Sequence, residues 1–250
     1  MLGLGKEKSS WHWTICGKHP IAADYFRSGT ETPLQEAFAV WVEEGFAAMP
    51  DSDEARHAIC IWRFWVRGAK KGSLICGVLK ASSDRIGRPY PLLIIGVGGL
   101  NGWEKHWAYL PAVLGEIWQH VEYVTSRRYE NLEELLAAIR MTAPPPADMP
   151  GALAQLNFEN NGTAPDNTAE TSLEINSLAK QLNESQQVRI PINANSQAAH
   201  DQPVLWGLRL KGRGVEIPQA LFIGGKPGQQ SLMLFMRSLN QADFVNLWSV

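Results

Sequence analysis

Cysteine is scarce in this chain, and its scarcity argues against one class of protein. The three cysteines, Cys16, Cys60 and Cys76, are odd in number and far apart in the sequence. A small secreted domain held together by disulfides would carry an even set at short spacings. We therefore expect a protein of a reducing compartment, without a disulfide framework.

Long hydrophobic runs are also missing. The longest, Pro89 to Leu100, is too short and too rich in glycine to span a bilayer. The first residues, 1–14, contain no apolar stretch followed by a small-residue cleavage site, so no secretory signal is predicted. We expect a soluble cytoplasmic protein with no membrane insertion.

Charge of either sign is in short supply. Only 19% of the 250 residues are charged, and 23 basic residues nearly balance 25 acidic ones. A net charge of −2 gives no electrostatic reason to expect binding to nucleic acid or to an anionic membrane. Ten tryptophans stand against five tyrosines. Most should fill the core, and some are candidates for a surface groove.

Hydrophobic periodicity predicts a mixed α and β protein. Apolar runs follow one another directly at 59–67, 73–81 and 91–97, which favours antiparallel strands over repeated βαβ units. A further strand is predicted at 11–16, and helical spacing at 33–49, 103–128 and 132–140. We expect an α+β fold, a largely antiparallel sheet with helices packed on it, for which a three-layer α/β/α arrangement is one solution.

The composition changes after Met141. Residues 142–170 are rich in Pro, Asn, Ala and Gly without periodicity, which is typical of a flexible linker or insertion. Residues 1–141 would then form an N-terminal core, and 171–250 would complete the same domain. Within this last part we predict a helix from a capping box at 171, strands at 204–211 and 220–223, and a helix at 240–248. The segment 231–236 fits a strand or a helix.

No catalytic, cofactor or metal motif is complete. Three glycine-rich loops, 15–20, 96–102 and 224–231, each lack a residue that phosphate binding requires. The spacing of His12, Cys16 and His19 is not completed by a CxxC or HExxH motif. No nucleophile elbow is present either. We predict no catalytic residues, no cofactor and no metal.

Polar residues of opposite charge concentrate in two short segments, and two interpretations of them stay open. These residues are Lys18, Asp24, Asp84, Arg85 and Arg88. One interpretation is an ion-pair network that fixes the turn around Gly87, because arginine pairs bidentately with carboxylates. The other is a polar patch, edged by Trp62 and Trp65, that docks a partner protein. Both can hold, since a fixed loop is a pre-organised binding loop.

An ordered set of motifs resembles the TagF (ImpM) family of type VI secretion accessory proteins. The family patterns G-K-x-P-x-x-x-D-F, W-x-F and S-x-D-x-x-G-R-x-x-P appear as GKHPIAADYF at 17–26, WRF at 62–64 and SSDRIGRPYP at 82–91. Ala23, Tyr25 and Tyr90 depart from the family pattern by small or aromatic exchanges. The candidate motif or partner-binding residues are Lys18, Pro20, Asp24, Trp62, Trp65, Asp84, Arg85, Gly87, Arg88 and Pro91.

The resemblance implies a non-enzymatic, cytoplasmic, post-translational negative regulator of type VI secretion. Its expected partner is the forkhead-associated scaffold protein of the secretion apparatus, with no nucleic acid involved. The alternative from the residues themselves is a small ligand-binding or hydrolytic domain with a polar pocket near Lys18, Asp24, Asp84 and Arg88.

Overall fold

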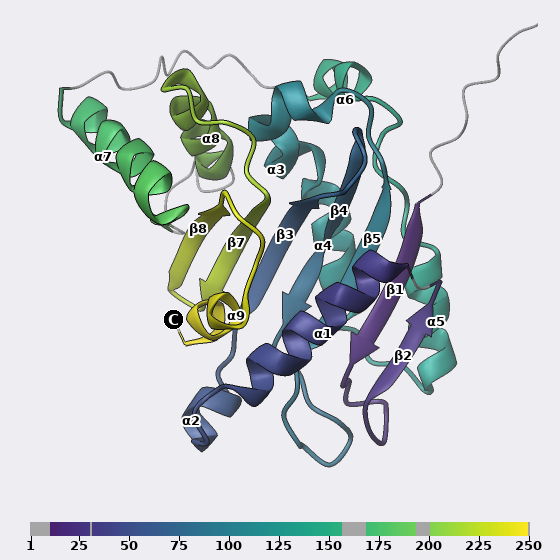
Figure 1. Cartoon of the computed structure of the whole chain (residues 1–250). Coiled ribbons are helices and arrows are strands. Elements are labelled where there is room, and N and C mark those ends of the chain that lie inside the picture. The colour runs from purple at the N-terminus through teal and green to yellow at the C-terminus, as the bar shows by residue number, and fades with distance from the viewer. Residues whose placement is uncertain (1–10, 31, 157–168, 194–200, 250) are drawn as a thin grey trace, which may run out of the picture.

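One eight-stranded antiparallel sheet organises the protein (Figure 1). The computed structural model describes residues 11–30, 32–156, 169–193 and 201–249. The strand order is β2-β1-β5-β4-β3-β7-β8-β6, with antiparallel pairing throughout. The strands are β1 (His12–Gly17), β2 (Phe26–Gly29), β3 (Ile61–Arg67), β4 (Ser73–Lys80), β5 (Leu92–Gly99), β6 (Gln187–Ile192), β7 (Ala220–Lys226) and β8 (Gln229–Phe235). The predicted α+β fold is confirmed.

Helices cover both faces of this sheet, so the three-layer α/β/α arrangement is the one adopted. On one face, α1 (Pro33–Ala47) and α9 (Gln241–Trp248) enclose one hydrophobic core; Figure 1 shows both in front of the strands. The second core lies on the other face. Its helices are η1 (Trp103–Tyr109), α3 (Leu110–Val113), α4 (Gly115–Val124), α5 (Leu132–Arg140), α6 (Met149–Gln155), α7 (Ala169–Ser185) and α8 (Gln202–Gly212). The short α2 (Asp53–Arg56) precedes β3.

The central strand β3 sends alternate side chains into the two cores. Trp62 and Phe64 face α1 and α9, whereas Trp65 faces the other layer, 5.5 Å from the ring of Trp103. Trp62 and Trp65 are both 0% exposed. The expectation that they edge a surface patch is therefore wrong, because a strand paired on both sides and covered on both faces leaves neither side chain at the surface.

Trp62 also ties the sheet to the C-terminal helix. Its indole Nε1 donates a hydrogen bond to the Leu247 carbonyl at 3.0 Å, and Trp41 Nε1 donates to the Asn240 carbonyl at 2.7 Å. Asn240 itself caps α9 by accepting from the Asp243 amide. The two ends of α9 are thus each held by a buried indole.

The predicted strand at 204–211 is wrong. Residues Gln202–Gly212 form α8, in which Val204, Gly207 and Leu210 are buried at a spacing of three. The alternating order of bulky and small residues resembles a strand pattern, but Pro203 lies in the first helical turn and Gly207 packs closely against Ala108 of η1.

The predicted helix at 103–128 is broken into η1, α3 and α4. Pro111 lies in the first turn of α3 and Gly115 begins α4, and both residue types weaken a continuous helix. Because α4 ends at Val124, Arg127 and Arg128 lie beyond the helix.

The predicted linker or insertion at 142–170 contains a packed helix in its described part. Met149 and Ala152 of α6 are buried, and the Asp148 side chain caps it at Gly151. Residues 157–168 lie outside the described part of the chain. The division of the chain at this segment stays a prediction, although β6, β7 and β8 belong to the same sheet as the earlier strands.

Other elements agree closely with expectation. The helix predicted at 33–49 is α1, the one at 132–140 is α5 behind its Asn131 cap, and the one at 240–248 is α9. The ambiguous segment 231–236 is strand β8 up to Phe235. The short outer strands β2 and β6 were not predicted.

Candidate functional site

Two loops leave the sheet side by side and form the candidate site. The β1–β2 loop covers 18–25 and the β4–β5 loop covers 81–91. They meet because β1 pairs with β5, with Gly17 opposite Leu92. At Gly17, φ is +123° and an added Cβ would lie 2.1 Å from the Pro91 carbonyl oxygen. Only glycine tolerates this approach, which explains the glycine that precedes Lys18.

The second loop is built around the buried carboxylate of Asp84. Asp84 opens a turn that closes when the Gly87 amide donates to the Asp84 carbonyl at 2.9 Å, with Gly87 at φ +87°. Asp84 Oδ1 accepts from the amides of Ile86 at 3.1 Å and Arg88 at 3.0 Å. Its side chain is 0% exposed. The carboxylate therefore holds the turn from inside.

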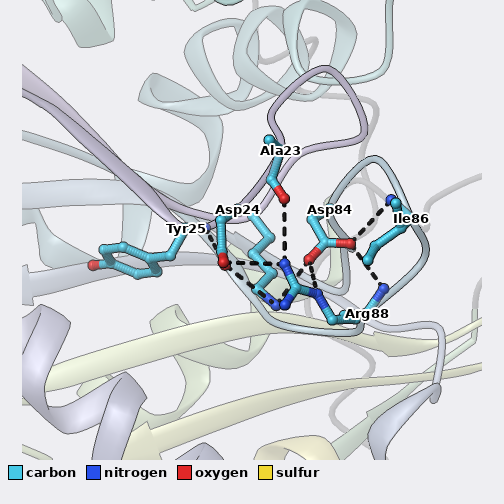
Figure 2. Close-up of polar contacts among 7 residues, drawn as sticks. Ala23, Asp24, Tyr25, Asp84, Ile86 and Arg88 are labelled. Carbon is cyan, nitrogen blue, oxygen red and sulfur yellow. Dashed lines mark hydrogen bonds and ion pairs between the residues drawn. The ribbon is translucent and has the colours of Figure 1, made fainter.

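Two cations and a second carboxylate surround Asp84 (Figure 2). Asp84 Oδ2 lies 2.6 Å from Arg88 Nε and 3.1 Å from Lys18 Nζ. Arg88 Nη2 also reaches Asp24 Oδ2 at 3.0 Å and donates to the Ala23 carbonyl at 3.3 Å. We call Lys18, Asp24, Asp84 and Arg88 the ion-pair cluster. It joins the two loops to each other.

The protonation of both carboxylates follows from these contacts. Burial alone would raise the pKa of Asp84, but hydrogen bonds from the Arg88 amide, the Lys18 and Arg88 side chains and the Ile86 amide outweigh it and hold the pKa well below its usual range. The pKa of Asp24 is also lowered, chiefly by the hydrogen bond from the Tyr25 amide. Both groups are ionised at neutral pH, so the cluster contains two positive and two negative charges.

Outside this cluster the loops present apolar side chains to solvent. Ile86 is 74% exposed at the tip of the turn, and Tyr25 is 45% exposed. In Figure 2 the Tyr25 ring points away from the ion pairs, and it meets Tyr90 edge to face at 5.5 Å. Burial of part of its ring raises the pKa of Tyr25 to about 12. Arg85 is exposed beside Ile86, while its amide donates to the Ala22 carbonyl at 2.9 Å.

The structure gathers most, but not all, of the predicted residues. Arg85, Gly87 and Pro91 belong to the same two-loop unit as the ion-pair cluster. Pro20 faces a neighbouring cleft. Trp62 and Trp65 lie apart from the unit, in the two cores.

Sequence reasoning missed that neighbouring cleft, of about 700 Å³. It lies between the two loops, the residues around α2 and the end of α4. Four of its lining residues are Arg56, Lys80, Arg127 and Arg128. The adjacent arginines after Ser126 are a visible signal, but the helix predicted from the sequence runs through Arg128, and no role is assigned there to either arginine.

The other candidate chemistry finds no support in the described residues. Across them, no group of three His, Cys, Asp or Glu side chains is arranged to hold a metal ion. All three cysteines are buried, and burial raises the pKa of Cys60 to about 12, which disfavours the nucleophilic thiolate. No helix in the described part is both long and apolar enough to cross a membrane.

Comparisons with known protein families and solved structures show which proteins this chain resembles. Residues 14–141 match the TagF N-terminal domain, which is type VI secretion system-associated. The crystal structure of PA0076 from Pseudomonas aeruginosa PAO1 is similar with a TM-score of 0.55 and 17% identity, over 96% of this chain and 94% of that one. At this identity the likeness concerns the fold alone. A comparison with curated protein sequences found no match. Since the family match spans more than half of the 250 residues and contains both loops of the site, this chain belongs to the TagF family of type VI secretion system-associated proteins.

Proposed function

We propose that this protein is a non-enzymatic cytoplasmic regulator that restrains type VI secretion by binding the forkhead-associated scaffold of the apparatus. Membership of a secretion-associated family supports the process. The two-loop unit supports a binding role, because it offers a fixed surface. The scaffold and the direction of regulation come from the family resemblance.

One observation carries the binding role: Ile86 is 74% exposed on a loop that is fixed from within. The Asp84 carboxylate accepts two amides of this turn and pairs with Lys18 and Arg88. A loop that is already ordered loses little conformational entropy when a partner binds. An apolar side chain on such a loop gains the transfer free energy of burial on contact. This is the usual composition of an interface anchor with a polar rim.

The same contacts weigh against a polar pocket at the ion-pair cluster. Lys18 and Arg88 already pair with Asp84 and Asp24, so a charged ligand would have to displace an internal partner. Separating a buried charge from its partners is costly. A partner protein that contacts the outer face of the loop leaves every ion pair intact, and we favour it for that reason.

We expect Ile86→Asp to weaken binding of the purified scaffold protein by about tenfold or more. A charge in place of an anchor must be desolvated at the interface, and hot-spot changes cost about 2 kcal/mol or more. Isothermal titration calorimetry with the scaffold measures the effect. The melting temperature should not fall, because the side chain contributes almost no buried area.

Leu173→Asp is the matched control. Leu173 is 71% exposed on α7, well away from the β4–β5 loop (Figure 1). It undergoes the same change of aliphatic to acidic side chain at nearly the same exposure. Equal affinity of both variants and the parent protein would refute the proposed surface. Absence of binding by the parent protein would refute the proposed partner.

A further inference from the structure

The cleft beside the ion-pair cluster is positively charged, although the chain as a whole is slightly acidic. Arg56, Lys80, Arg127 and Arg128 line it, and no Asp or Glu is among its described lining residues. The whole chain carries a net charge of −2. A local group of four cations in a slightly acidic protein marks a region of positive potential. We call this cavity the basic cleft.

The carboxylates near the basic cleft compensate these charges poorly. Asp51 pairs with Arg56 at 3.2 Å, but it is 97% exposed, and exposed pairs are weak. Glu122 already makes a bidentate pair with Arg63, at 2.6 and 2.8 Å. Glu122 also attracts Lys80 and acts to raise its pKa, but burial of Lys80 outweighs this attraction.

Among the described residues, the hydrogen bonds of Lys80 and the ring contacts of Arg127 are made with neutral groups. Lys80 Nζ donates to the Thr125 carbonyl at 3.5 Å and to Ser126 Oγ at 3.1 Å. The guanidinium of Arg127 lies 5.5 and 5.7 Å from the rings of Tyr123 and Tyr129. Arg128 is exposed and makes no ion pair with any residue in the described part of the chain.

Hydrogen bonds hold Lys80 and the loop that faces it in fixed positions. Lys80 ends β4, a central strand, and its ammonium is fixed at the end of α4. The buried His19 joins the facing loop to the same place: its Nδ1 accepts from the Ile21 amide at 3.2 Å, and its ring bonds the Thr125 backbone. Burial lowers the pKa of both His19 and Lys80, so an anion in the cleft would stabilise the charged lysine.

The remaining walls suit the organic part of a ligand. Ile21, Ile59 and Pro89 provide apolar surface, and Ser82 and Ser83 provide hydroxyl groups. A volume of about 700 Å³ lies within the range of small-molecule sites. Arginine forks and a lysine ammonium are the groups that recognise phosphate oxygens.

We propose that the basic cleft binds a phosphate-bearing small molecule, with Lys80, Arg127 and Arg128 on the phosphoryl group and the apolar wall on its organic part. The cleft borders the two-loop unit, since Gly87 and Pro89 line it, but its basic residues lie on other elements, and the proposal does not depend on the proposed regulatory role. It requires no glycine-rich phosphate loop, because side chains and not backbone amides supply the donors.

The test is calorimetric titration of the full chain with inorganic pyrophosphate and, separately, with ADP. Pyrophosphate offers two phosphoryl groups alone, whereas ADP carries the same number and adds an organic part. We expect saturable binding of at least one of them below about 1 mM, weakened by added salt. Tighter binding of ADP than of pyrophosphate would assign a role to the apolar wall, and equal binding would restrict the site to the phosphoryl groups.

Two charge reversals assign the binding to this cleft. Arg128→Glu should weaken it about tenfold or more, since the change removes a charge-assisted hydrogen bond and places a negative charge beside the phosphoryl group. Lys71→Glu makes the same change of sign at the β3–β4 turn, at the other end of β4, and should alter affinity by less than about twofold.

Three results would overturn the proposal. They are no binding of either probe by the parent protein, equal weakening by both reversals, and binding of an oligoglutamate peptide in preference to both probes. The last would instead assign the cleft to an acidic protein segment. Arg128 is exposed, so loss of folding is not expected to obscure the comparison, and melting curves of each variant verify this.

Discussion

Trp62→Ala should lower the free energy of unfolding by about 3–5 kcal/mol. The indole is 0% exposed between the sheet, α1 and α9, so its removal leaves a cavity that the surrounding strands cannot close. It also leaves the Leu247 carbonyl without the hydrogen bond at 3.0 Å. Urea unfolding followed by circular dichroism measures the loss.

Trp62→Phe separates the loss of buried volume from the loss of the hydrogen bond, and Trp206→Ala serves as a control at a less buried tryptophan. Trp62→Phe keeps most of the ring volume but removes the donor, and should cost about 1–2 kcal/mol. Trp206→Ala removes a partly exposed indole that stacks with Arg209 on α8, and should cost no more than about 1.5 kcal/mol. If Trp62→Ala were no more harmful than Trp206→Ala, the sheet-to-α9 contact would not stabilise the fold as described.

Asp84→Asn should lower the melting temperature by roughly 6–12 °C. The carboxylate accepts two amides through Oδ1 and faces Arg88 and Lys18 through Oδ2. An amide group in its place cannot satisfy all four donors, and it leaves two cations without their buried counter-charge. The same variant should weaken partner binding, because the turn that presents Ile86 would lose its internal support.

Asp24→Asn is the control for burial. Asp24 pairs with the same two cations, but its side chain is 63% exposed. Screening by solvent should limit the fall in melting temperature to about 2 °C or less. Similar falls for the two variants would contradict the assignment of Asp84 as the internal support of the loop.

The pH dependence has a definite sign. The pKa of Asp84 is lower in the folded protein than the ordinary value of about 3.9, so its contribution to stability is fully present above that value. The contribution falls as the pH drops below about 4 towards the lowered folded pKa. The difference in melting temperature between the parent protein and Asp84→Asn should therefore be constant from about pH 5 to 8 and shrink in stronger acid.

Local chemistry made part of this structure predictable. The Asn131 cap, the helical spacing of apolar residues at 33–49 and the successive central strands each depend on residues that lie close together in the sequence. The Asp84 turn is equally local, since aspartate at its start and glycine at its end are typical of such a turn. The ion-pair interpretation of this loop was therefore predictable from the sequence.

The features that were missed depend on distant contacts. The short edge strand β6 contains Pro191 and, among the described strands, pairs with β8 alone. In α8, packing against η1 outweighs an alternating pattern. The basic cleft brings together the end of α2, the end of β4 and the turn after α4, and no local pattern links Arg56 to Arg128. Burial of Trp62 likewise depends on α9, which lies at the other end of the chain.

The pairing of β3 with β7 has a consequence for synthesis on the ribosome. Until Ala220–Lys226 emerges, Ile61–Arg67 has no neighbour on one edge, and the aromatic face that α9 later covers stays bare. At bacterial elongation rates the interval is on the order of ten seconds. An unpaired strand edge with Trp62 and Phe64 beside it is prone to associate with other chains during that time. The nascent protein should therefore be a client of chaperones that act before translation ends, and a stop codon near 141 should produce aggregates instead of a working half-protein.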